Sequence, residues 1–101
     1  MMACFARRDL SGYYRINASI HTAINEAARN PVLTATYRSI NARVQSLRFR
    51  TNQNEAKWKL AVAEHEQMIE ALAAHDADAM RKVLVAHVLR KRDTVLELLR
   101  E

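Results

Sequence analysis

The chain of 101 residues contains only one glycine, one proline and one cysteine. Glycine and proline interrupt helices, so their scarcity in a chain that is half hydrophobic predicts an all-α fold. A lone Cys4 rules out a disulfide framework, which fits a reducing cytoplasm. Apolar runs are too short for a membrane span, and the first residues lack the apolar core of a signal peptide, so neither an anchor nor export is expected.

What the chain does contain is helical periodicity. Apolar residues recur at helical spacing in four segments, which predicts helices over residues 9–29, 31–49, 54–74 and 76–99, with a polar linker at 51–54. Either Asp9 or Ser11 can cap the first helix, and Asn30 and Asn54 can cap the next two. Asp76 and Asp78 open the fourth, because acidic residues suit a helix N-terminus. Residues 1–9 show no period and are expected to be a tail. Short connections then predict an antiparallel bundle of about four helices over residues 10–101, as one domain.

The same spacing predicts which face of each helix points inward. In the second helix this face comprises Leu33, Thr36, Tyr37, Ile40, Val44 and Leu47. In the third and fourth helices it includes Trp58, Met68, Ile69, Leu72 and Val88.

Three histidines share these inner faces: His21, His65 and His87, each on a different helix. An unsatisfied buried imidazole costs free energy, so each needs a partner. One interpretation is three separate core histidines, each hydrogen-bonded, for example to a carbonyl. The other is a metal site, because neutral imidazole suits divalent transition metals and a bundle interior gathers ligands from distant helices. Asn17, one turn before His21, offers a fourth donor, and periodicity alone leaves both interpretations open.

Four short motifs follow one another in a characteristic order. They are Asn17 four residues before His21, the segment 30–33, Glu64 next to His65, and Asp76 eleven residues before His87. Together they resemble the FCD domain, the C-terminal ligand-sensing domain of FadR-subfamily GntR transcription regulators. The similarity extends from about residue 10 to residue 99.

The resemblance implies a helical bundle that binds a divalent metal such as zinc, nickel or manganese. The implied ligands are Asn17, His21, His65 and His87, with Asn17 standing where the family most often has aspartate. In such domains the metal leaves open positions for a small carboxylate effector or water. Effector binding is then relayed to a winged-helix DNA reader.

The resemblance also implies that the chain is a partial sensing domain, because no winged helix precedes residue 10 and the first helices of a complete domain are not seen. A natural truncation, a start codon assigned too late and a fragment all fit this expectation. A partial bundle leaves part of its apolar face uncovered, and a partner usually covers such a face. We therefore expect a homodimer.

Two cations, Arg43 and Lys91, border or interrupt apolar faces, and Lys91 lies one turn beyond His87. A cation in such a place can extend to water or hold a carboxylate beside a metal. Both residues are candidate effector contacts.

A small metalloenzyme is the main alternative, since three histidines with an open position also describe catalytic zinc. We expect no general base on the ligand face, because Glu64 and Glu66 adjoin His65 and should point away from it. The net charge of +5 also permits contact with nucleic acid. Aromatic residues are few and no helix-turn-helix with a basic recognition helix is visible, so we expect no sequence-specific DNA binding by this chain alone.

Overall fold

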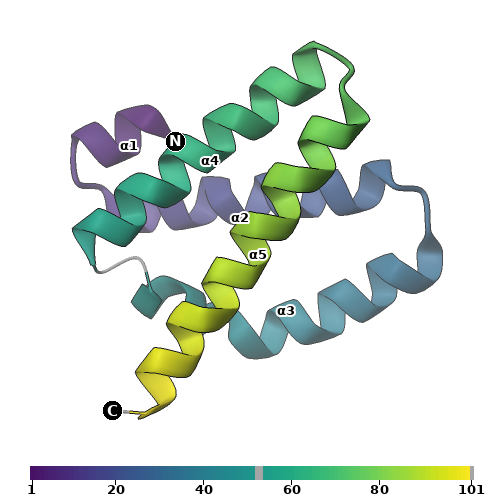
Figure 1. The fold of residues 1–101 in the computed structure, drawn as a ribbon. Coiled ribbons are helices and arrows are strands. Elements are labelled where there is room, and N and C mark those ends of the chain that lie inside the picture. Colours follow the sequence, from purple (N-terminus) through teal and green to yellow (C-terminus); the bar gives the residue numbers. More distant parts are fainter. Residues whose placement is uncertain (52–53, 101) are drawn as a thin grey trace. The chain divides into compact units, whose positions relative to one another are not determined.

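The computed structural model describes residues 1–51 and 54–100, apart from the side chains of residues 46, 48, 49 and 51 (Figure 1). The helices in these residues are α1 (Met2–Ala6), α2 (Leu10–Ala27), α3 (Pro31–Thr51), α4 (Glu55–Ala73) and α5 (Ala77–Arg100). The described residues contain no strand, so the predicted all-α class is confirmed. The chain divides into two compact units, Met1–Arg50 and Thr51–Glu101, and each is described by itself.

Helix α1 packs against α2 and buries Cys4, where a tail was expected. A helix of five residues is too short to display a period, which is why the sequence did not reveal it. The connection to α2 turns at Arg8, whose φ of 58° is left-handed. The predicted domain boundary at residue 10 stays a prediction.

Helix α2 begins after Asp9, the first of its two predicted caps. The Asp9 carboxylate accepts a hydrogen bond from the Gly12 backbone N–H at 2.9 Å. The single glycine has a steric reason to be here, because a Cβ on Gly12 would collide with that carboxylate. The buried positions of α2 include Tyr13 and Asn17.

Helix α3 also begins as predicted, since the Asn30 side chain accepts from the Leu33 N–H at 3.1 Å, and Pro31 fills the first helical position. Its expected inner face is only partly buried, because Leu33 and Ile40 are 45% and 54% exposed whereas Tyr37, Val44 and Leu47 are half-buried. An exposed ion pair joins it to α2, with Arg38 Nη2 3.2 Å from Glu26 Oε1. Such surface pairs contribute about 0–1 kcal/mol.

In the second unit, α4 and α5 form an antiparallel hairpin (Figure 1). Asn54 caps α4 by accepting from the Lys57 N–H at 3.2 Å, and Asp76 caps α5 by accepting from the Ala79 N–H at 3.0 Å. The chain reverses at His75, which is exposed and has a left-handed φ of 53°. Of the predicted linker, residues 52 and 53 lie outside the described residues, while Thr51 already belongs to α3.

The core of the hairpin is the inner face of α4 against α5. The buried apolar residues of α4 are Trp58, Ala61, Val62, Met68 and Ala71. Ile69 and Leu72 were predicted to join them, but they are 60% and 53% exposed. Val88 of α5 was also predicted inward and is largely exposed. An ion pair between Lys57 and Glu97, 2.7 Å apart, joins the two helices at their open end.

Among the described helices, none combines the length and the apolar character that crossing a lipid bilayer requires.

Candidate metal centre

His65 lies on the inner face of α4 and is 3% exposed. Its Nδ1 is 2.7 Å from the carbonyl oxygen of Ala61, one turn earlier. A carbonyl only accepts, so Nδ1 carries the proton and, in the neutral ring, Nε2 carries the lone pair. Burial lowers the pKa of His65 to about 4 and outweighs the opposing effects of the Ala61 carbonyl and of Glu64, while the charge of Lys91 also lowers it. The ring is therefore neutral at physiological pH.

His87 lies on α5 and is 4% exposed. Its Nδ1 is 2.7 Å from Oε1 of Glu64, a buried carboxylate on α4. The carboxylate accepts, so Nδ1 of His87 donates and Nε2 again carries the lone pair of the neutral ring. Burial lowers the pKa of His87 and outweighs the opposing effect of Glu64.

The Glu64 carboxylate has a second partner on α5. The Arg90 guanidinium donates to both of its oxygens, Nη1 to Oε2 and Nη2 to Oε1. Burial alone would raise the pKa of Glu64, but the hydrogen bonds from Arg90 and His87 bring it below the ordinary value. Glu64 is therefore a carboxylate held from two sides, and it is not available as a general base.

The two imidazoles are close enough to act together. Their ring centroids are 4.7 Å apart, with the planes at 76°, and a ring nitrogen of each lies within 4.8 Å of one on the other. Metal-bound histidines usually donate their second ring N–H to a carbonyl or carboxylate, as both rings do here. The residues of this hairpin thus fit two neutral nitrogen ligands of a divalent transition metal.

Lys91 follows His87 by one turn and is half-buried. Its positive charge lowers the pKa of both His65 and His87, so it lies within electrostatic range of the pair. Its predicted role as an effector contact stays a prediction.

The other predicted site residues belong to the first unit. Asn17 is buried and His21 is half-buried, one turn apart on α2, whereas Arg43 is exposed on α3. Their part in a site with His65 and His87 stays a prediction.

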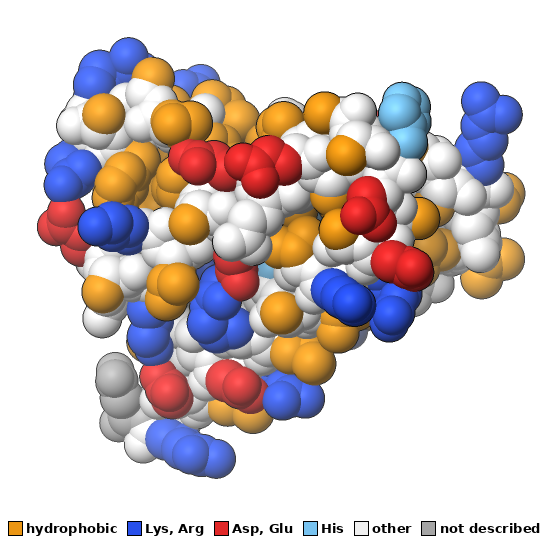
Figure 2. Space-filling model, turned by 45° about the horizontal axis from the view of Figure 1, so that its top comes forward, with side chains coloured by type: hydrophobic (Ala, Val, Ile, Leu, Met, Phe, Trp, Pro, Cys, Tyr) orange, Lys and Arg blue, Asp and Glu red, His pale blue; other side chains and the backbone are white. Residues whose placement is uncertain are grey.

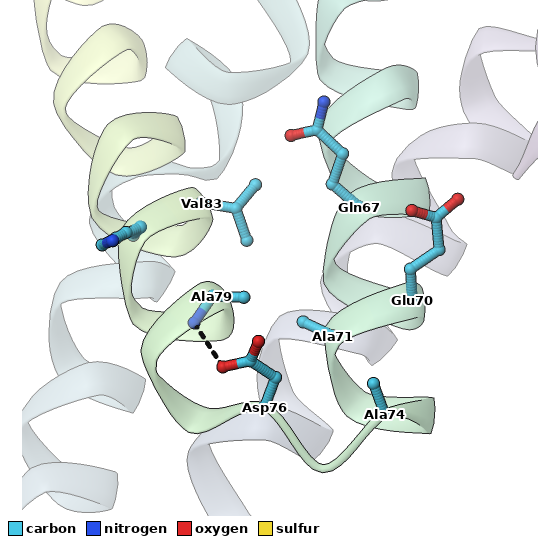
Figure 3. Close-up of a pocket in the computed structure, with 8 residues that line it drawn as sticks. Gln67, Glu70, Ala71, Ala74, Asp76, Ala79 and Val83 are labelled. Carbon is cyan, nitrogen blue, oxygen red and sulfur yellow. Dashed lines mark hydrogen bonds between the residues drawn. The ribbon is translucent and has the colours of Figure 1, made fainter.

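A separate hollow lies beside the α4–α5 turn. It is an open depression of about 560 Å³ between the two helices, near Ala71, Ala79 and Val83. Figure 3 shows Asp76 at its lower end, bonded to the backbone of Ala79, and Gln67 and Glu70 on its α4 side. No histidine is among the described residues that line it. This hollow is therefore not the histidine site.

Sequence reasoning missed the roles of Glu64 and Arg90. Glu64 was expected to point away from the ligand face, but its side chain is buried and contacts His87 on the facing helix. A signal was present, since Ala61, Glu64 and Met68 follow helical spacing and share the buried face. A buried carboxylate needs donors, and the facing helix supplies His87 and Arg90.

A small all-α domain with a buried, hydrogen-bonded imidazole pair on facing helices has the layout of a ligand-binding helical domain. The chain belongs to the FCD domain family, whose model matches residues 1–90 and so includes α1. FCD domains are ligand-sensing, regulatory parts of transcription regulators and are not enzymes, so the metalloenzyme alternative is set aside. Comparisons with curated proteins and with solved structures give no match.

Proposed function

We propose that the chain is the effector-binding and dimerisation domain of a bacterial GntR-type regulator of the FadR subfamily, acting in the cytoplasm. Its ligands are a divalent metal (zinc, nickel or manganese) and a small carboxylate. The observation that carries the proposal is the commitment of both buried Nδ1 atoms, of His65 and His87, to oxygen acceptors. This arrangement leaves each neutral ring with its lone pair on Nε2, the form that a metal requires.

We propose that His21 and Asn17 complete the ligand set. They lie one turn apart, so both project from one side of α2. A third neutral imidazole and an amide oxygen are ligands that zinc, nickel and manganese accept. The resemblance to FCD domains supports the same four residues.

The effector follows from charge. A divalent metal held by four neutral ligands keeps its full positive charge, and it would supply Lewis acidity to an anionic ligand. Lys91 adds a cation near the histidines. A small carboxylate would bind both positive charges, the metal and Lys91. Arg43 is a second candidate for its side-chain partner.

Calorimetric titration tests this function most directly. Protein stripped with a chelator is titrated at pH 7.5 with zinc, nickel and manganese chlorides in turn. We expect one site per chain for at least one metal, reversed by the chelator. Absence of binding for all three metals would remove the metal from the proposal.

The Asn17→Asp variant tests the fourth ligand. A carboxylate adds a full negative charge beside a dication, so zinc or manganese should bind at least about tenfold more tightly, which corresponds to roughly 1.4 kcal/mol. The measurement is calorimetry on both proteins under the same buffer conditions. An unchanged dissociation constant would mean that Asn17 is not a ligand and that the site rests on three histidines.

Dimerisation is proposed through α5, which presents a second, outward apolar face. Five residues on one side of α5 form this stripe and are 44% to 66% exposed: Val85, Val88, Leu89, Leu96 and Leu99. Hydrophobic side chains also reach the surface among charged ones on the face drawn in Figure 2. A stripe of this kind is usually covered by a partner, and a second copy would cover it with an identical stripe.

We expect size-exclusion chromatography with light scattering to show a dimer at micromolar concentration. Leu96→Lys should weaken the dimer at least about tenfold, because a charge would be placed in an apolar contact. Ala86→Lys is the matched control, since Ala86 is exposed and lies about 100° round the helix from Val85. A monomeric wild-type protein, or equal effects of the two variants, would contradict dimerisation through this stripe.

A further inference from the structure

We propose that Glu64 and Arg90 are positioning residues that fix the tautomer of His87 and thereby set the affinity of the site for metal. This inference rests on the proposed metal-binding function. It assigns a role to two residues that are not ligands themselves. Their arrangement is a chain of contacts, from the Arg90 guanidinium to the Glu64 carboxylate and on to Nδ1 of His87.

The two histidines differ in how their rings are held. His65 bonds to the carbonyl of Ala61 on its own helix, so regular α4 backbone fixes its ring. His87 has no such local support in its Nδ1 bond, which reaches across to Glu64 on the other helix. The protonation site of His87 therefore depends on a side chain that could rotate.

Arg90 prevents that rotation. Two parallel N–H donors to the two carboxylate oxygens define the plane of the Glu64 carboxylate, which a single ammonium could not do. Arg90 lies three residues after His87, so both donors to Glu64 come from the same side of α5. Because the Glu64 side chain is only 10% exposed, water cannot easily replace either donor.

The direct test is the tautomer of His87 in metal-free protein, read from two-bond proton–nitrogen NMR correlations. We expect wild-type His87 to carry its proton on Nδ1. Glu64→Ala removes the acceptor and should move the proton mainly to Nε2. Zinc affinity should then fall about 10- to 100-fold although His65 and His87 are both intact, as is usual for partners of metal-bound histidines.

Arg90→Gln is the second variant, and it protects the test against misfolding because the Arg90 side chain is 35% exposed. It should let the Glu64 carboxylate rotate and should weaken zinc binding several-fold. Arg90→Lys should not restore wild-type affinity. Glu97→Gln is the matched control, since it breaks another α4–α5 ion pair, the one with Lys57, and should leave both readouts unchanged.

The two possible failures are distinguishable. If wild-type protein binds no metal, the proposed function fails, and the tautomer measurement still decides the role of Glu64. If metal binds and the Glu64 and Arg90 variants keep both the Nδ1 proton and the wild-type affinity within threefold, the positioning role is overturned.

Discussion

Replacing His65 or His87 with alanine is expected to abolish the stabilisation that zinc gives to the folded protein. A ligand that binds only the folded state raises the free energy of unfolding by roughly 2.7 kcal/mol when its concentration is a hundred times the dissociation constant. The measurement is urea unfolding of each protein with zinc and with chelator. The difference between the two conditions removes the separate effect that losing a buried side chain has on stability.

The chain supplies its own controls for this experiment. His75 is exposed at the α4–α5 turn, so His75→Ala removes a histidine without touching the buried pair. Lys91→Ala removes a nearby charge that is proposed to bind the effector and not the metal. Both variants should keep the full zinc-dependent increment. A loss of the increment in His75→Ala would show that zinc acts at another place.

Lowering the pH is expected to reduce the free energy of unfolding of the metal-free protein. The pKa of His65 is lowered from 6.5 to about 4 in the folded state, chiefly by burial. Below pH 6.5 His65 is protonated in the unfolded chain but stays neutral in the folded chain. The free energy of unfolding therefore falls as the pH drops from about 6.5 to about 4. The loss from this residue alone is about 3 kcal/mol.

The neighbouring groups act in the same sense. The pKa of His87 is also lowered, and that of Glu64 lies below 4.5, so protonation of either group favours the unfolded state. Free energies of unfolding at pH 7.5, 6, 5 and 4, all with chelator, measure the slope. His65→Gln should flatten it. A free energy that changes by less than about 0.5 kcal/mol between pH 7.5 and 4 would contradict a neutral buried His65.

The starts of the four longer helices were predictable because they depend on local chemistry. Asn30 and Asn54 accept the capping bonds predicted for them, and Asp9 does so as one of two candidates. Asp76 was predicted at a helix start for its charge, and it also caps α5. A capping bond joins residues three apart, so a short stretch of sequence is enough to predict it.

Burial was less predictable. The period of α3 correctly groups Leu33 with Ile40, but period alone does not say whether anything covers that face, and both residues are largely exposed. The candidate site shows the same limit. His65 and His87 were found because histidine is unusual on an apolar face. Glu64 was missed because its partners, His87 and Arg90, lie on another helix. The sequence of one helix does not show which residues of another helix it will contact.

The histidine pair has one consequence for how the protein acquires its fold. Glu64 and His87 are 23 residues apart, joined by one tight turn, so their contact closes a short loop. The entropy of closure grows only with the logarithm of loop length, and a contact this local is among the first that a chain can make. The α4–α5 hairpin is therefore suited to form while the rest of the chain is still unfolded. Two of the four proposed metal ligands, His65 and His87, would then be in place before the rest of the chain folds.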